Sequence, residues 1–441
     1  MSSVRLHAPV VLPCDPTCTV LRDAVVDINA DGRLGYVGPA STAPRSTAPI
    51  EHHPGILLPG LVNTHAHTPM TLLRGLGGDL PLMRWLREVI WPAEARLRPG
   101  DVYNGMLLGC VEMLRAGVTT SAEMYFHGEQ VAEATLAAGS RVLLGGPVID
   151  LPSTNWRSML RSIEKWIDTD GLRFGAGERI ELGYGAHSAY MLPAEALTEI
   201  VASAAERDAL VQIHVAESMQ EDQQQRARYG SVPAMLAQLG LLSGRMIAAH
   251  AVHVSDADIE LFARHGVGVA HCPGSNAKLA SGVARLVDLR PAGVPVGLGT
   301  DGPASNDDLD LWEEIRLAAL LARLATDDAT AVTAADALLL ATRGGAEALG
   351  RSDLGALEPG RWADIVHVNT DDPAFVGGLE VPAEQLLANL VWAARSRTIS
   401  TVWVAGERVL DHGEPVRLDR AAVQAAANES AAYLRTPAWP E

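Results

Sequence analysis

The chain contains few lysines, few cysteines and no long apolar run, although 48% of its 441 residues are hydrophobic. Its formal net charge is −18 and it has no basic run, whereas nucleic-acid-binding proteins usually carry a basic face. No apolar stretch is long enough to cross a bilayer. The first residues also lack the basic segment and apolar core of a signal peptide. We therefore expect no nucleic-acid or membrane partner, and a cytoplasmic protein that acts on small molecules.

The cysteine content argues against two kinds of zinc site. The four cysteines are scattered along the chain, at Cys14, Cys18, Cys110 and Cys272. So few thiols fit a reducing compartment, and their spacing does not predict a structural zinc knuckle. The chain also lacks the Cys-x-x-Cys and His-x-Glu pattern of the cysteine-ligated zinc deaminases. Only two lysines occur, Lys165 and Lys278, and this scarcity bears on the metal count considered below.

Both ends of the chain show a sequence pattern that is typical of β-strands. Residues 4–58 alternate short apolar runs with turn residues, and NADG at 29–32 is typical of a hairpin turn. The same pattern returns near the C-terminus in ADIVHVNTD and ISTVWVAGERVLDHGEPV. We predict that residues 1–58 and 357–441 pair into one small β-sandwich domain.

The middle of the chain, residues 59–356, alternates short β-rich runs with helical patterns. Eight candidate strands are GLVNTHAH (60–67) and the runs at 117–125, 141–148, 180–187, 210–217, 245–250, 266–273 and 294–301. Helical periodicity fills the gaps, and Ser255 and Asp258 form a capping signal before one of these helices. Eight repeats predict an α/β fold, a (β/α)8 barrel. A doubly wound sheet would alternate in the same way, so periodicity alone does not choose between them.

Polar side chains follow several of these strands. His65 and His67 are two residues apart and therefore face the same side of a strand. Strands five, six and eight end in His214, His250 and Asp301. Strand four ends in His187. Because a barrel collects such groups at the carboxyl ends of its strands, we predict a metal site. Imidazoles with one carboxylate suit zinc or iron(II), with one position left open for water.

This arrangement predicts hydrolytic chemistry. Water bound to such a metal loses a proton with a pKa on the order of 7, and the resulting hydroxide is a strong nucleophile. Asp301 is the first candidate to accept the proton. Glu217, three residues after His214, is the candidate proton shuttle. His250 is expected to polarise the attacked atom or to hold the hydroxide.

Five motifs carry a resemblance to a known family. GLVNTHAHTPMTLLRG, HVAES, AAHAVHVSD, HCPGSNAKLASG and LGTDGPASNDDLDLWEEIRLA resemble the amidohydrolase superfamily. More narrowly, they resemble its 5′-methylthioadenosine and S-adenosylhomocysteine deaminases, with triazine chlorohydrolases and guanine deaminases nearby. The resemblance implies one metal ion per subunit, held by His65, His67, His214 and Asp301. Binuclear relatives require a lysine on strand four, and IELGYGAH has none.

The resemblance also implies contacts with the substrate. MRWLREVIWPAEARL is similar to the segment that these deaminases place over the sugar. Trp85 is then expected to pack on the substrate and Glu94 to accept hydrogen bonds from the ribose hydroxyls. His187 matches a purine-contacting histidine. Arg141 and Arg157 are candidates for the tail attached to the ribose. Such relatives often form dimers or tetramers, so the resemblance implies a homo-oligomer.

Three functions compete at this point. The favoured one is deamination of a 6-aminopurine nucleoside by attack at C6 and release of ammonia. The second keeps the same site but hydrolyses a chlorinated s-triazine, or deaminates guanine or a pterin. The third is a non-catalytic barrel, although such proteins typically lose metal ligands, and here every predicted ligand is present.

Overall fold

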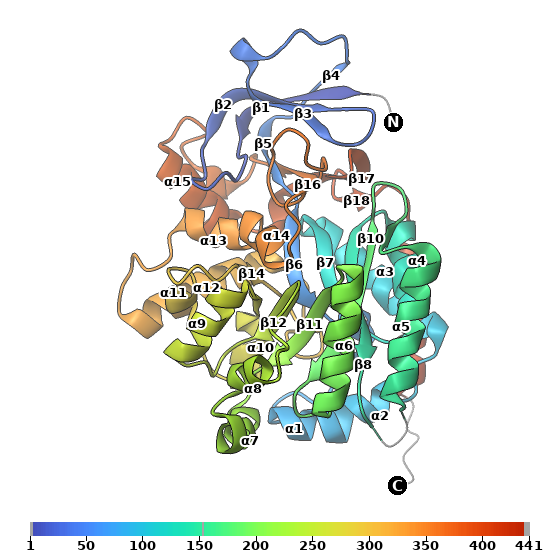
Figure 1. Cartoon of the computed structure of the whole chain (residues 1–441). Helices are drawn as coiled ribbons and strands as arrows, with labels where there is room; N and C mark the ends of the chain where they lie inside the picture. The colour runs from blue at the N-terminus through green and yellow to red at the C-terminus, as the bar shows by residue number, and fades with distance from the viewer. Residues whose placement is uncertain (1–2, 152–153, 436–441) are drawn as a thin grey trace.

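The computed structural model describes residues 3–151 and 154–435, without the side chains of residues 221, 222 and 224. Two nine-stranded sheets organise the chain. In Figure 1 the blue N-terminal strands and the orange-red C-terminal strands lie together at one end of a barrel, while α1, α2 and α7 lie at the other end. The fold therefore leaves one end of the barrel to helices and loops alone.

The predicted (β/α)8 barrel is confirmed. Its eight strands are parallel and follow the order of the sequence around the sheet, with β9 as an extra antiparallel strand on β10. The strands are β6 (Leu61–Ala66), β7 (Val118–Met124), β8 (Arg141–Val148), β9 (Arg173–Phe174), β10 (Ile180–Ser188), β11 (Leu210–Val215), β12 (Met246–His250), β13 (Gly268–His271) and β14 (Val296–Leu298). Sequential parallel neighbours with intervening helices distinguish this barrel from a doubly wound sheet.

The barrel closes at the first and last strands. The Asp301 backbone N–H donates to the His65 carbonyl at 3.0 Å, and an isolated parallel bridge joins Ala66 to Asp301. The Asn63 side chain makes reciprocal hydrogen bonds with Thr300, donating to its hydroxyl at 2.8 Å and accepting from its N–H at 3.1 Å. Closure thus brings the histidine pair of strand one beside the aspartate of strand eight.

Helices surround the barrel, and several begin with side-chain caps. Ser255 and Asp258 form the predicted capping box at the start of α9. The helices are α1 (Leu82–Trp85), α2 (Trp91–Glu94), α3 (Pro99–Arg115), α4 (Gly128–Ala138), α5 (Trp156–Asp170), α6 (Ala194–Arg207), α7 (Met219–Tyr229), α8 (Val232–Gln238), α9 (Asp256–His265), α10 (Pro273–Lys278), α11 (Leu286–Leu289), α12 (Leu311–Thr326), α13 (Ala334–Leu340), α14 (Arg343–Ala348), α15 (Ala383–Ala388) and α16 (Arg420–Arg435). Among the described residues, no helix has both the length and the apolarity to span a membrane.

The second sheet is built from both ends of the chain, as the sequence predicts. Its order is β18-β17-β16-β15-β5-β1-β2-β3, with β4 paired to β1. The strands are β1 (Val4–Val11), β2 (Leu21–Ile28), β3 (Leu34–Pro39), β4 (Ile50–His52), β5 (Gly55–Pro59), β15 (Ile365–Asn369), β16 (Ile399–Val404), β17 (Glu407–Asp411) and β18 (Glu414–Pro415). Antiparallel pairing of β15 with β5 joins the two ends of the chain.

A buried ion pair connects the barrel to this sheet. Arg141 stands at the start of β8, so it lies at the amino end of the barrel strands, and its guanidinium donates two hydrogen bonds to Asp364 at 3.0 and 3.1 Å. Asp364 also accepts from the Ala405 N–H at 2.6 Å. The second sheet therefore covers the amino end of the barrel, and the carboxyl end stays available for chemistry.

Candidate active site

A cavity of about 440 Å³ opens at the carboxyl end of the barrel. Side chains from the strand ends form its floor, while the short helices α1 and α2 and the π-helical turn Leu86–Ile90 between them form a wall. The lining residues that the sequence predicted are His67, Trp85, Glu94, His187, His214, Glu217, His250 and Asp301. Eight of the predicted side chains thus meet in one cavity of a size typical of small-molecule sites.

The histidines and the aspartate of the strand ends form one cluster. Potential ligand atoms of His65, His67 and Asp301 lie within 4.8 Å of one another, and so do those of His65, His214 and His250. His65 is 1% exposed, and its Nε2 has no hydrogen-bond partner. Burial lowers the pKa of His65 to about 4, so its imidazole is neutral at physiological pH and can act as a ligand.

The hydrogen bonds of two histidines indicate what the cluster holds. His67 Nδ1 lies 2.7 Å from the Met124 carbonyl, and His214 Nδ1 lies 2.7 Å from the His187 carbonyl. A carbonyl only accepts, so each Nδ1 carries the proton and each Nε2 of a neutral ring presents a lone pair. Those two Nε2 atoms face each other at 3.3 Å. Facing lone pairs repel unless a cation lies between them, and these residues therefore fit a metal ion.

The two oxygens of the Asp301 carboxylate have different surroundings. Oδ2 accepts hydrogen bonds from the Ser275 and Ser305 hydroxyls at 2.6 and 2.9 Å. Oδ1 faces the ring nitrogens of His65 and His67 at 3.5 and 3.3 Å. Burial alone would raise the pKa of Asp301, but the surrounding imidazoles hold it well below its ordinary value. The carboxylate is thus ionised, with one oxygen directed at the cluster.

His250 and Glu217 complete the floor of the cavity. His250 Nδ1 lies 2.9 Å from the Asn276 side-chain oxygen, which orients the ring so that Nε2 points toward the site. That Nε2 is 3.9 Å from Glu217 Oε2. Burial raises the pKa of Glu217, as is typical of a carboxyl group that exchanges protons during a reaction.

The backbone at two strand ends is strained. His250 has φ 72° and Asp301 has φ 59°, values in the left-handed region that non-glycine residues rarely adopt. Each residue is the last, or follows shortly after the last, of a parallel strand. Such strain persists where the surrounding structure over-determines it, and it gathers at functional sites.

Two residues of strand β7 hold the His67 segment in place through hydrogen bonds. The Glu123 carboxylate accepts hydrogen bonds from both the N–H (2.9 Å) and the hydroxyl of Thr68, the residue after His67. Met124, which follows Glu123 in β7, supplies the backbone carbonyl that orients the His67 ring. The 3-10 turn Thr68–Leu73 is therefore tied down at its first residue, and the His67 ring cannot rotate freely.

The predicted substrate contacts lie on the walls of the cavity. Trp85 is buried and donates from its indole N–H to the Leu76 carbonyl at 3.2 Å. Desolvation raises the pKa of Glu94 to about 7, with the Tyr125 hydroxyl and His67 opposing the rise. Burial lowers the pKa of His187 to about 3, so this imidazole is neutral and offers one donor and one acceptor.

The two arginines considered for the substrate tail lie outside this cavity. Arg157 stands on α5, where its guanidinium pairs with Glu195 and lies 3.6 Å from Glu199. Arg141 is at the opposite end of the barrel, paired with Asp364. The predicted strand 141–148 already placed Arg141 at its first residue, whereas the site forms where strands end, so the prediction of Arg141 as a substrate contact was inconsistent with that strand.

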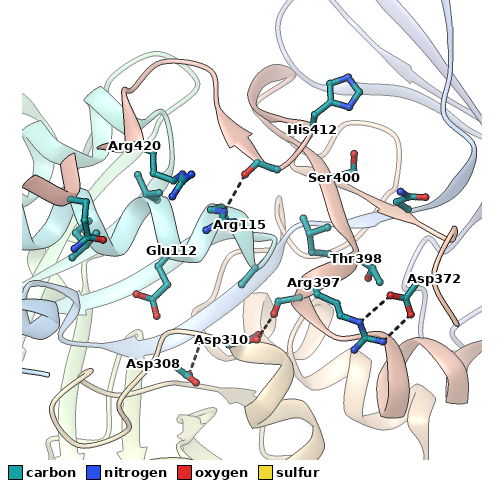
Figure 2. Close-up of a pocket in the computed structure, with 18 of the residues that line it drawn as sticks. Glu112, Arg115, Asp308, Asp310, Asp372, Arg397, Thr398, Ser400, His412 and Arg420 are labelled. Atoms are coloured by element: carbon teal, nitrogen blue, oxygen red, sulfur yellow. Dashed lines mark hydrogen bonds and ion pairs between the residues drawn. The ribbon is translucent and has the colours of Figure 1, made fainter. Parts of the chain in front are cut away.

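A second cavity, of about 780 Å³, lies between α3, α16 and the loops around β16 and β17. Figure 2 shows that its charged side chains face one another, with Arg397 directed at Asp372 and Arg115 at the loop after β17. Among the described lining residues His412 is the only histidine, and no metal-type cluster occurs there. The cavity at the carboxyl end of the barrel is therefore the candidate active site.

Several supporting residues escaped the sequence analysis. Ser275 and Asn276 come from the first turn of α10, Ser305 from the loop after Asp301, and Asn63 from strand β6. All four lie inside motifs that already signalled the family, GLVNTHAH, HCPGSN and TDGPAS. Ser275 and Asn276 contact Asp301 and His250, which lie at or just after the ends of other strands, so only the fold reveals which side chain each of these two orients.

The fold and its cavity define a (β/α)8 barrel with a histidine and aspartate cluster of the kind that hydrolases use to hold a metal ion. The family model described as "Amidohydrolase family" matches residues 56–409. The chain therefore belongs to the amidohydrolase family.

Relatives of known name cover nearly the whole chain. A 5-methylthioadenosine/S-adenosylhomocysteine deaminase from Pelotomaculum thermopropionicum is 40% identical, covering 98% of this chain and 99% of the relative. The Moorella thermoacetica protein of the same name is 42% identical, with 91% and 92% covered. An adenosine deaminase from Xanthomonas campestris with bound zinc superposes with a TM-score of 0.92 at 37% identity, covering 99% of both chains. The zinc complex of atrazine chlorohydrolase from Arthrobacter aurescens gives 0.88 at 26% identity, with 97% and 100% covered.

Proposed function

We propose that the protein is a metal-dependent deaminase of 6-aminopurine nucleosides, converting the C6 amine to an oxo group with water and releasing ammonia. The observation that carries the proposal is the pair of Nε2 lone pairs of His67 and His214 facing each other at 3.3 Å in the cavity. Full-length similarity to methylthioadenosine/S-adenosylhomocysteine deaminases supports the substrate class.

One metal ion fits the cluster, held by His65, His67, His214 and Asp301. Zinc is the proposed ion, because three neutral imidazoles and one carboxylate suit it and two similar structures contain it. When bound, zinc supplies the Lewis acidity that makes water nucleophilic at neutral pH.

The remaining groups of the floor move and hold protons. Asp301 Oδ1 faces the site and is placed to accept a proton from the attacking water. Glu217, whose pKa is raised by burial, can deliver its proton to the purine ring nitrogen and then relay the proton of the new C6 hydroxyl to the leaving amine. The proton accepted by Asp301 then restores Glu217. His250, oriented by Asn276, holds its Nε2 toward the oxygen that attacks C6.

The walls are proposed to bind the nucleoside itself. Glu94 lines the cavity from α2, and its carboxylate can accept from two adjacent ribose hydroxyls. The Trp85 ring offers a flat apolar surface, and the neutral His187 can exchange a hydrogen bond with the purine. The predicted cytoplasmic location and homo-oligomeric state stay predictions.

The test is a deaminase assay over adenosine, 5′-deoxyadenosine, methylthioadenosine and S-adenosylhomocysteine. We expect loss of the adenine absorbance band with stoichiometric ammonia for at least one of them. The signal should disappear after chelation and return with added zinc. Absence of ammonia from every nucleoside, with metal bound, would refute the proposal.

A second candidate is hydrolysis of a chlorinated s-triazine at the same site. The specific observation in its favour is the superposition on atrazine chlorohydrolase, with a TM-score of 0.88. Chloride release from a chlorotriazine, with adenine nucleosides inert, would select it. Glu94 weighs against it, because a chlorotriazine has no pair of hydroxyls to donate to this half-buried carboxylate.

A further inference from the structure

The cavity walls are apolar, and the ionisable groups on them are acids or histidines. The apolar lining comes from Leu82, Trp85, Leu86, Ile90, Trp91, Leu97, Ile149, Leu151 and Leu279. The acidic lining residues are Glu94, Glu217 and Asp301. Over the described part of the chain, neither an arginine nor a lysine lines this cavity.

Two arginines that lie near the cavity in sequence form ion pairs outside it. Arg84, the neighbour of Trp85, forms an ion pair with Glu88 on the exposed side of the helix. The Arg157 guanidinium pairs with Glu195 and stacks at 4.1 Å on the Trp156 ring. Within the cavity, as lined by the described residues, a carboxylate on a bound substrate would therefore find no guanidinium to pair with.

We infer that this site selects adenine nucleosides whose 5′ substituent is uncharged, such as a hydroxyl, a hydrogen or a short alkyl thioether, over those whose tail ends in a carboxylate. The inference rests on the proposed function and narrows it. A carboxylate pressed against leucine and isoleucine loses its hydration without gaining a charge-assisted hydrogen bond. The acidic side chains in the same cavity add repulsion. A thioether methyl group gains contact with the same walls.

The decisive experiment compares two substrates that differ only in charge. Two 5′-thioether adenosines of equal length are assayed with the zinc-loaded enzyme, one ending in a carboxylate and the other in the matching carboxamide. We expect kcat/KM to be at least about 100-fold higher for the carboxamide, the effect of one unpaired buried charge. Methylthioadenosine should exceed S-adenosylhomocysteine in the same direction.

The outcomes separate the two claims. If the carboxylate substrate is turned over within about tenfold of the carboxamide, the inference is overturned while the deaminase function stands. If no adenine nucleoside is deaminated, the proposed function fails and the inference with it.

A variant tests the physical cause. Leu151 is half-buried on the cavity wall, so an introduced guanidinium can reach both the cavity and solvent. We expect Leu151→Arg to raise kcat/KM for the carboxylate substrate about tenfold relative to the carboxamide. Leu151→Gln is the control, with similar length and no charge, and should leave the ratio unchanged. Equal ratios for wild type and both variants, with intact folds by melting temperature, would overturn the charge argument.

Discussion

At the level of single residues, hydrogen bonding to backbone carbonyls decides the chemistry of the site. His67 and His214 each give their Nδ1 proton to a carbonyl, so both present Nε2 lone pairs to the cavity. The two oxygens of the Asp301 carboxylate also differ, because Oδ2 accepts hydrogen bonds from two serine hydroxyls while Oδ1 faces the histidine cluster. Neither the tautomers nor this difference can be read from the residue types alone.

His65 is 1% exposed, and among the described residues its Nε2 has no hydrogen-bond partner and faces the Asp301 carboxylate at 3.5 Å. We expect His65→Ala to lower the metal content from one zinc per chain to near zero and to abolish deamination, because three ligands remain for a site built from four. Elemental analysis with a parallel ammonia assay measures both. His7→Ala, in the other sheet, is the matched control. Full zinc content in the His65 variant would contradict the assignment.

Glu217 is expected to act on protons without holding the metal. Glu217→Gln preserves shape and hydrogen bonding but cannot give up a proton, so turnover should fall by about 10²–10⁴-fold. The zinc content and melting temperature should stay at wild-type values. A variant with wild-type turnover would refute the shuttle role.

At the level of elements, α12 braces the loops that orient the site. Glu314 on α12 accepts from the Gly274 N–H at 2.9 Å and from the Asn306 side chain at 3.0 Å. Gly274 belongs to α10, which carries Ser275 and Asn276, and Asn306 follows Ser305. One buried carboxyl group therefore connects both loops that contact Asp301 and His250.

This brace predicts a pH-dependent stability. Burial, with a smaller contribution from the acids Asp308 and Glu313, raises the pKa of Glu314 from 4.5 to about 8. The folded state thus retains a proton that the unfolded chain has lost, so this group's contribution to stability falls as pH rises from about 4.5 to 8. We expect Glu314→Gln to remove that slope.

Melting temperatures of wild type and the Glu314→Gln variant between pH 5 and 8.5 check this expectation. The wild-type advantage over the variant should shrink steadily as pH rises across this window. Parallel curves would show that Glu314 does not titrate there. Asp308, whose pKa burial raises to about 7, is present in both proteins and contributes to both curves.

The strands and helices of the barrel could be predicted from the sequence more closely than the helical wall of the cavity. All eight predicted strands form, with ends shifted by a few residues, since apolar runs buried on both faces specify them strongly. The wall made of α1, Leu86–Ile90 and α2 was anticipated only by resemblance. Its helices are four or five residues long, too short for periodicity to define.

At the level of the whole molecule, the second sheet and the barrel share a buried ion pair. Arg141 and Asp364 have side-chain exposures of 0% and 4%, and Arg141 also donates to the carbonyls of Gly177 and Glu178. The pair joins the amino end of β8 to the segment before β15. The ion pair therefore fixes the second sheet against the barrel at the end that is remote from the cavity.

Removing one partner of this pair should weaken the whole fold. We expect Asp364→Ala to lower the free energy of unfolding by about 3–5 kcal/mol, because Arg141 is left buried without a counter-charge. Chemical denaturation measures the change. Glu414→Ala, which removes an exposed partner of Arg420, is the control and should leave stability nearly unchanged. Similar effects for both variants would contradict the structural role.

The sequence by itself determined the alternation of strands and helices, the β-strands at both termini and the residues of the cluster, because local patterns of burial and residue type carry that information. Only the tertiary structure decided which atoms face one another. The Nε2 atoms of His67 and His214 meet because strands one and five end in the same cavity. Arg141 lies away from that cavity because it stands at the start of its strand, at the opposite end of the barrel. Proximity between distant strands is a property of barrel closure, and no local pattern in the chain encodes it.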